Sequence, residues 1–109
     1  MQTELKYIEL KTGYSDDGPA WIACLAFSKT GRTVYFNGRE LQRWNGIYGN
    51  HVDTQSGEEY WISGVMKSGA NRHPCGCGKI MVQRDMLAEF LAWTGQDALD
   101  NRLYEVVDP

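Results

Sequence analysis

The sequence predicts one domain that is mainly β-sheet with one C-terminal helix, an α+β chain. Short apolar segments recur between turn residues over most of the chain, the hydrophobic spacing becomes helical from Asp85, and 109 residues suffice for one domain but not for two. We expect a small antiparallel, partly open SH3-like barrel, or else a meandering sheet, covered by the helix. The expected layout is a single domain over 1–109, with strands over about 5–82, a helix over about 85–94 and a tail over 96–109.

The strands follow from alternation, apolar runs and turn residues. Residues 20–27 are almost wholly apolar, which is typical of a strand buried on both faces, so we place this strand at the centre of the sheet. Asn37-Gly38 tolerates the positive φ angles of a type I′ turn and predicts a hairpin between 32–36 and 39–44. The other expected strands are 5–10, 52–54, 58–66 and 80–82, with Gln55-Ser56-Gly57 as a second hairpin turn.

The helix follows from a change of period after the last of these strands. Leu87, Phe90 and Leu91 share one helical face, Asp85 is suited to cap its first turn, and Gly95 is suited to end it. Residues 103–107 read as a strand or an extended tail. We expect the helix to cover an open end or a face of the sheet.

Composition excludes several classes of protein. No apolar run approaches the roughly 18–20 residues that cross a bilayer, and residues 1–6 lack the basic and apolar pattern of a secretory signal. Three cysteines are an odd number, which fits a reducing compartment better than a disulfide framework, so we expect a cytoplasmic protein with no membrane partner. Basic residues gather in 29–50 and 67–84 and acidic ones in 85–109, which is typical either of an anion-binding face or of ordinary solvated surface.

Four segments carry a resemblance to a known family: YIELKTGY at 7–14, DGPAWI at 17–22, FSKTGRTVY at 27–35 and GEEYWISG at 57–64. Over roughly 7–73 the chain resembles a family of short uncharacterised bacterial proteins. Some members carry the name of 1-deoxyxylulose-5-phosphate synthase, an enzyme that is far longer and uses thiamine diphosphate. Because 109 residues leave no room for its cofactor domains, the resemblance implies no such activity and no catalytic residue.

The composition favours a non-enzymatic binding module over an enzyme. The domain is small and poor in convergent polar residues, whereas its Trp, Tyr and Arg content exceeds what a core of this size needs, and these residue types dominate protein interfaces. We therefore expect a protein–protein interaction module of unknown partner. The binding surface predicted from turn placement consists of Arg39, Arg43, Trp44, Tyr48, Arg72 and His73.

Single-stranded nucleic acid is the first alternative partner. Small barrels bind it through cationic grooves with aromatic platforms, and Trp44 and Tyr48 could stack on bases while Arg39 and Arg43 meet phosphates.

A zinc site is the second alternative. His73, Cys75 and Cys77 place one imidazole and two thiols within five residues, although structural zinc pairs have two or more residues between their cysteines. We therefore expect no cofactor, with zinc on this loop as the alternative. His51 and Asp53 share a strand face, as a base and its orienter would, but the chain offers them no convincing nucleophile.

Overall fold

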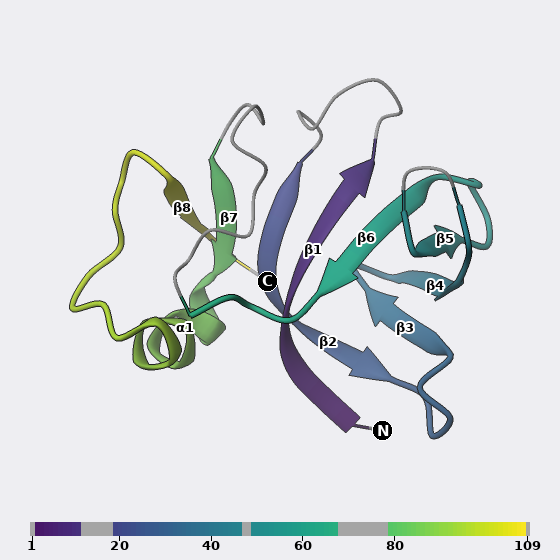
Figure 1. Ribbon diagram of the computed structural model, residues 1–109, viewed down its shortest axis with the longest axis horizontal. Helices are drawn as coiled ribbons and strands as arrows, with labels where there is room; N and C mark the ends of the chain where they lie inside the picture. Colours follow the sequence, from purple (N-terminus) through teal and green to yellow (C-terminus); the bar gives the residue numbers. More distant parts are fainter. Residues whose placement is uncertain (1, 12–18, 47–48, 68–78, 109) are drawn as a thin grey trace.

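The computed structural model describes residues 2–11, 19–46, 49–67 and 79–108, and it is mainly β, as predicted. The molecule measures 37 × 34 × 22 Å, with a six-stranded barrel on one side and the C-terminal elements on the other (Figure 1). None of the helices in these ranges is both long enough and apolar enough to cross a membrane.

The barrel is closed, so the expectation of a partly open one is wrong. Its strands run in the order β1-β6-β5-β4-β3-β2, and β1 also pairs with β2. All of these neighbours are antiparallel. The six strands are β1 (Gln2–Lys11), β2 (Ala20–Phe27), β3 (Thr33–Phe36), β4 (Arg39–Arg43), β5 (His51–Asp53) and β6 (Glu59–Ser63).

Closure depends on the length of β1. Residues Gln2–Glu9 pair with β2, and residues Tyr7–Lys11 pair with β6 on the opposite edge. The expected strand began at Leu5, whereas the exposed residues Gln2–Glu4 also belong to β1 and pair with β2. The strand is therefore long enough to pair with β2 along most of its length and with β6 along its second half.

The wall formed by β1 and β2 is buried on both faces, which confirms the expectation for 20–27. Ala23 and Leu25 face the barrel interior, and Ala20 and Ile22 face outward into a second core. The inner core consists of Ile8, Ala23, Leu25, Val34, Phe36, Leu41, Tyr60 and Ile62. The outer core consists of Tyr7, Ala20, Ile22, Val65, Ile80, Val82, Phe90 and Tyr104.

The C-terminal elements enclose the outer core. β7 (Ile80–Gln83) runs parallel to β2, and β8 (Tyr104–Val107) runs parallel to β7. A 3₁₀ turn (Arg84–Met86) and α1 (Leu87–Thr94) connect them, and Phe90 of α1 packs edge-on against Tyr104, with ring centroids 5.3 Å apart. Of the two alternatives for 103–107, the strand is confirmed as β8, and this part of the sheet is parallel, unlike the antiparallel sheet we expected.

The expected helix stop is confirmed and the expected cap is not. Gly95 adopts φ 74° and donates its backbone N–H to Leu91, which ends α1 in the left-handed conformation that glycine tolerates. The residue before α1 is Met86, and it makes no side-chain cap, so the prediction of Asp85 as N-cap is wrong. The hairpin prediction at Asn37-Gly38 is confirmed, since both residues have positive φ, 51° and 73°.

Candidate functional site

Three of the six predicted binding residues lie in the described part of the chain. Arg39 and Arg43 are the first and last residues of β4, and Trp44 follows directly. Arg39 and Arg43 share a strand face with Leu41, which is fully buried in the barrel. The two arginines therefore sit at opposite ends of the barrel interior, about 13 Å apart along the strand. The remaining three predicted residues, Tyr48, Arg72 and His73, lie outside the described residues.

Arg39 forms an ion pair within the fold. Its guanidinium Nη1 lies 2.5 Å from Oδ2 of Asp53, a residue that is only 2% exposed. The backbone N–H of Gln55 donates to the other carboxylate oxygen at 2.9 Å. The backbone hydrogen bond from Gln55 has the larger effect and the bond from Arg39 the next, and together they lower the pKa of Asp53 to about 2. Arg39 therefore neutralises a buried charge at the β5–β6 turn as well as reaching the surface.

Arg43 lies opposite His51, a buried residue of β5. Burial lowers the pKa of the His51 imidazole, and the positive charge of Arg43 lowers it further. The Nδ1 atom of His51 lies 2.8 Å from Oδ1 of Asn50, whose side-chain amide also exchanges hydrogen bonds with the backbone of Ile62 in β6. Since Asp53 bonds to Arg39 and the turn, the structure assigns His51 and Asp53 to separate networks.

Two tryptophans are half-exposed on the outside of the barrel, and we name them the outer tryptophan face. Trp44 is 50% exposed and Trp61 of β6 is 42% exposed. Trp61 points outward because its neighbours Tyr60 and Ile62 are buried inside. Glu59 lies two residues before Trp61 and therefore on the same outer face of β6.

Gly46 lies where the side chains of Trp44 and Glu59 come close to each other. A Cβ on Gly46 would collide with Oε1 of Glu59 and would lie 2.5 Å from Cδ1 of Trp44, so a larger residue would require these side chains to shift. The same Oε1 accepts the backbone N–H of Gly49 at 3.0 Å. The Trp44 ring therefore lies beside the 46–49 segment although half of the residue is exposed.

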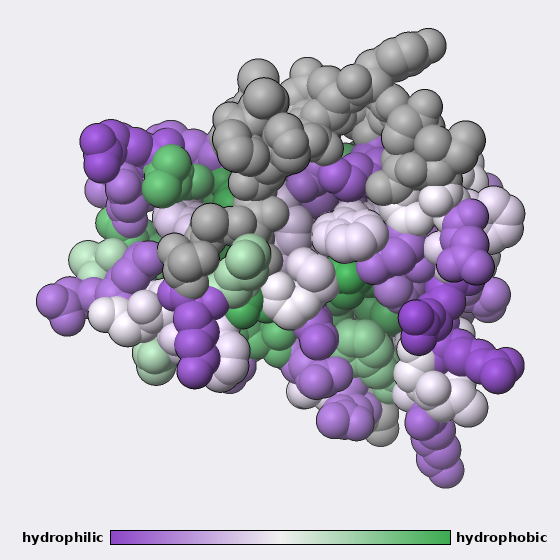
Figure 2. Space-filling model, in the orientation of Figure 1, coloured by the Kyte–Doolittle hydropathy of each residue, from purple (hydrophilic) through white to green (hydrophobic). Residues whose placement is uncertain are grey.

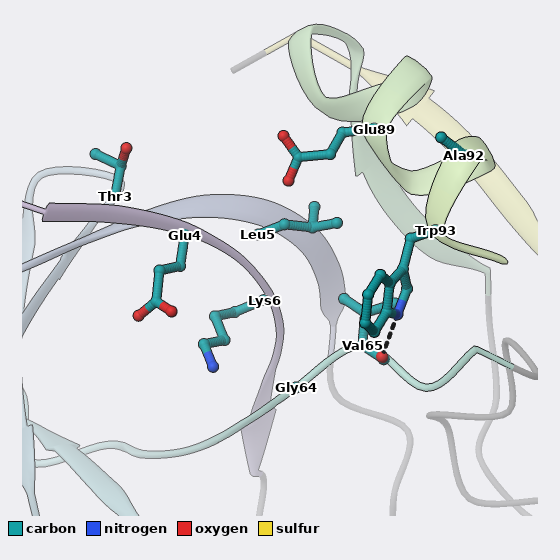
Figure 3. Close-up of a pocket in the computed structure, with 9 residues that line it drawn as sticks. All are labelled: Thr3, Glu4, Leu5, Lys6, Gly64, Val65, Glu89, Ala92 and Trp93. Atoms are coloured by element: carbon teal, nitrogen blue, oxygen red, sulfur yellow. Dashed lines mark hydrogen bonds between the residues drawn. The ribbon is translucent and has the colours of Figure 1, made fainter.

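A groove of about 650 Å³ lies between the first half of β1 and α1 (Figure 3), and we name it the edge groove. Its apolar floor and walls come from Leu5, Val65, Ala92 and Trp93. The other lining residues are Thr3, Glu4, Lys6, Gly64 and Glu89.

Trp93 fixes one wall of the edge groove. Its indole N–H donates to the backbone oxygen of Val65 at 2.7 Å, and the ammonium of Lys67 lies 4.8 Å from its ring centroid. The indole is nevertheless 49% exposed. No local pattern predicts this groove, because its residues in β1 and in α1 are more than eighty positions apart in the sequence. Trp61 could have been found, because the alternation in Tyr60-Trp61-Ile62 marks its side chain as outward.

Glu9 is a buried carboxylate outside both surfaces. It is 2% exposed, accepts a hydrogen bond from the Tyr7 hydroxyl, and pairs with Lys11 Nζ at 3.0 Å. The hydroxyl and the ammonium compensate the buried charge, as buried acids require.

No group of three or more metal-ligating side chains occurs within the described ranges. The residues of the zinc hypothesis, His73, Cys75 and Cys77, fall between those ranges, so the hypothesis stays a prediction.

Comparisons with protein-family models, with curated proteins and with solved structures gave no match to this chain.

Proposed function

We propose that this chain is a non-enzymatic module that binds a protein partner. The observation that carries the proposal is the outer tryptophan face: two indoles lie half-exposed on the barrel wall while both cores are filled without them. Trp is enriched among the residues that dominate binding energy at interfaces, because its large ring is amphipathic and loses little entropy on binding. We propose in addition that the barrel is SH3-like and that the protein is cytoplasmic.

The charges near the outer tryptophan face favour a protein over single-stranded nucleic acid. Glu59 lies close to Trp44, and the charge of Arg39 is already paired with Asp53. A phosphate backbone needs cations that are free to pair with it, and the charge of Arg39 is already used within the fold. A protein partner can offer an apolar surface to the indoles.

The buried polar groups support a non-enzymatic role. Asp53 is bound by Arg39 and backbone N–H groups, His51 by Asn50, and Glu9 by Tyr7 and Lys11. Each of these groups has a neighbour that satisfies it inside the fold.

The test is affinity capture on the immobilised chain, from a lysate of the organism that carries it, with matched variants. Trp44→Ala and Trp61→Ala should each remove the captured protein, whereas Leu103→Ala, a change at a similarly exposed apolar residue (56%), should not. A partner that binds all three variants equally contradicts the proposal.

Two further measurements separate the alternatives. Binding of a fluorescent oligothymidine that weakens steeply between about 50 and 200 mM salt would support the nucleic-acid reading. A stability loss on adding chelator would support zinc at His73, Cys75 and Cys77, because metal-binding free energy is also folding free energy.

A further inference from the structure

We propose that the edge groove accepts an extended segment of a partner polypeptide, which adds as a strand to the free edge of β1 beside α1. The inference goes beyond the proposed function, because it adds a second binding surface and names the conformation and pattern of its occupant. Since this surface differs from the outer tryptophan face, the two proposals can fail separately.

The hydrogen-bonding direction of β1 defines the free edge. The N–H of Leu10 donates to the oxygen of Pro19 at 2.9 Å, and these two residues continue the β1–β2 register. In an antiparallel pair, alternate residues bond to the same neighbour. The even-numbered residues of β1 therefore bond to β2, and the N–H and C=O groups of Thr3 and Leu5 point to the opposite edge.

β6 occupies that opposite edge only in part. It pairs with Tyr7–Lys11 and leaves β1 at Ser63, from where the chain passes to α1 through Gly64 and Val65 (Figure 1). Among the residues that the structure describes, no strand pairs with Thr3 or Leu5 on this edge. Unpaired donors and acceptors of this kind are a template for an added strand.

The edge groove provides the space for that strand. Thr3 and Leu5 line it together with Ala92 and Trp93 of α1, so the free edge opens into the groove rather than onto a flat surface. In Figure 2, hydrophobic residues are visible between more hydrophilic ones in the lower half of the face shown. A strand placed here would continue the line of β6 about 4.8 Å from β1.

The two sides of β1 predict the pattern of the bound segment. Leu5 points toward α1, while Glu4 and Lys6 point to the other side of the strand (Figure 3). A side chain of the segment level with Leu5 would contact Val65 and Trp93, whereas its neighbours would lie beside Glu4 and Lys6. The expected occupant therefore alternates apolar and charged residues.

A free segment suits this edge better than a second folded copy of the chain. The corresponding edge of a second copy also lies beside an α1, so pairing two copies edge to edge would bring two helices toward the same seam. An extended segment has no such obstruction, and its backbone supplies the donors and acceptors that match Thr3 and Leu5.

The experiment starts with a displayed library of random peptides of about ten residues, selected on the full chain. Amide hydrogen exchange with a selected peptide should protect Thr3 and Leu5 at least about tenfold, as hydrogen-bonded strand residues are protected. A peptide methylated on the backbone nitrogen that faces β1 should bind at least about tenfold more weakly, because it loses a donor and keeps its side chains.

Matched variants of Thr3 test the edge without disturbing the barrel. Thr3→Pro removes the N–H that faces away from β2, a position at which an edge strand tolerates proline, and Thr3→Val keeps it. We expect Thr3→Pro to weaken peptide binding at least about tenfold and Thr3→Val to leave it unchanged. The double variant Trp44→Ala/Trp61→Ala should bind the peptide normally, which separates this site from the outer tryptophan face.

Three results would overturn the inference. One is equal binding by the proline and valine variants. Another is failure to select any peptide that protects Thr3 and Leu5. The third is protection of these amides in the peptide-free chain, which would mean that the edge is already paired. Protection that dilution leaves unchanged would place this pairing within one molecule. Protection that dilution removes would place it between copies.

Discussion

Trp93 and Val65 are joined by a hydrogen bond from the indole N–H to the backbone oxygen, 2.7 Å long, that ties α1 to the segment leaving β6. Val65 is buried in the outer core, so the bond lies at its margin. It couples the barrel, which ends at Ser63, to the C-terminal elements.

Trp93→Phe should lower the free energy of unfolding by about 1 kcal/mol, because the Val65 oxygen loses its donor while the aromatic ring is kept. Urea unfolding measures the effect. Leu103→Ala, at an exposed position whose side chain belongs to neither core, should change stability by less than about 0.5 kcal/mol. Equal effects of the two changes would mean that the hydrogen bond is not formed in solution.

Gly38→Ala should destabilise the chain by about 1 kcal/mol. Gly38 has φ 73° and nothing within 4 Å of an added Cβ, so the cost is backbone strain alone. Gly64→Ala is the matched control, since a Cβ there also meets nothing within 4 Å and its φ is not positive. Thermal unfolding of both variants should show a lower melting temperature for Gly38→Ala only.

Asp53 should make stability depend on acid pH. Its folded pKa, about 2, lies below its ordinary value of 3.8, so its contribution is fully present above 3.8 and is lost as the pH falls toward 2. Asp53→Asn removes this contribution, so the stability difference between the two proteins should be largest above pH 3.8 and should shrink toward pH 2. Denaturant unfolding over that pH range measures it, and a constant difference would contradict the assignment.

Phe90→Ala should cost about 3–5 kcal/mol, because a fully buried ring that packs against Tyr104 leaves a cavity in the outer core. Leu41→Ala, in the inner core, should cost about 2–5 kcal/mol. Since β1 and β2 belong to both cores, each change should shift one cooperative transition. Two separate transitions in either variant would show that the cores unfold independently.

Local sequence patterns predicted most strands and turns. The apolar run 20–27 and the positive-φ pair Asn37-Gly38 carry their signals within a few residues, and both predictions are confirmed. The start of β1 was missed because Gln2–Glu4 are exposed and their pairing with β2 depends on residues more than twenty positions away. The strand alternative for 103–107 is confirmed as β8, whereas its parallel pairing with β7 depends on residues more than twenty positions away and was not predicted.

The candidate surfaces were predicted less well than the fold. Trp44 is exposed, as the binding hypothesis requires, whereas Arg39 is committed to Asp53, a residue fourteen positions away that no local pattern links to it. The edge groove forms only when β1, near the N-terminus, and α1, in the C-terminal part of the chain, lie side by side. Surfaces built by such long-range contacts leave no periodic signal in the sequence.

The shared wall of β1 and β2 also governs the order in which the chain can be completed during synthesis. All six barrel strands have been made once Ser63 has emerged, yet at that moment Ala20 and Ile22 still face water, because β7 and α1 have not followed. The nascent barrel therefore exposes an apolar surface until the residues that form β7 and α1 have been synthesised. A chain truncated between Ser63 and Ile80 would lack β7 and α1, so we expect it to aggregate or to bind chaperones that recognise exposed apolar surface.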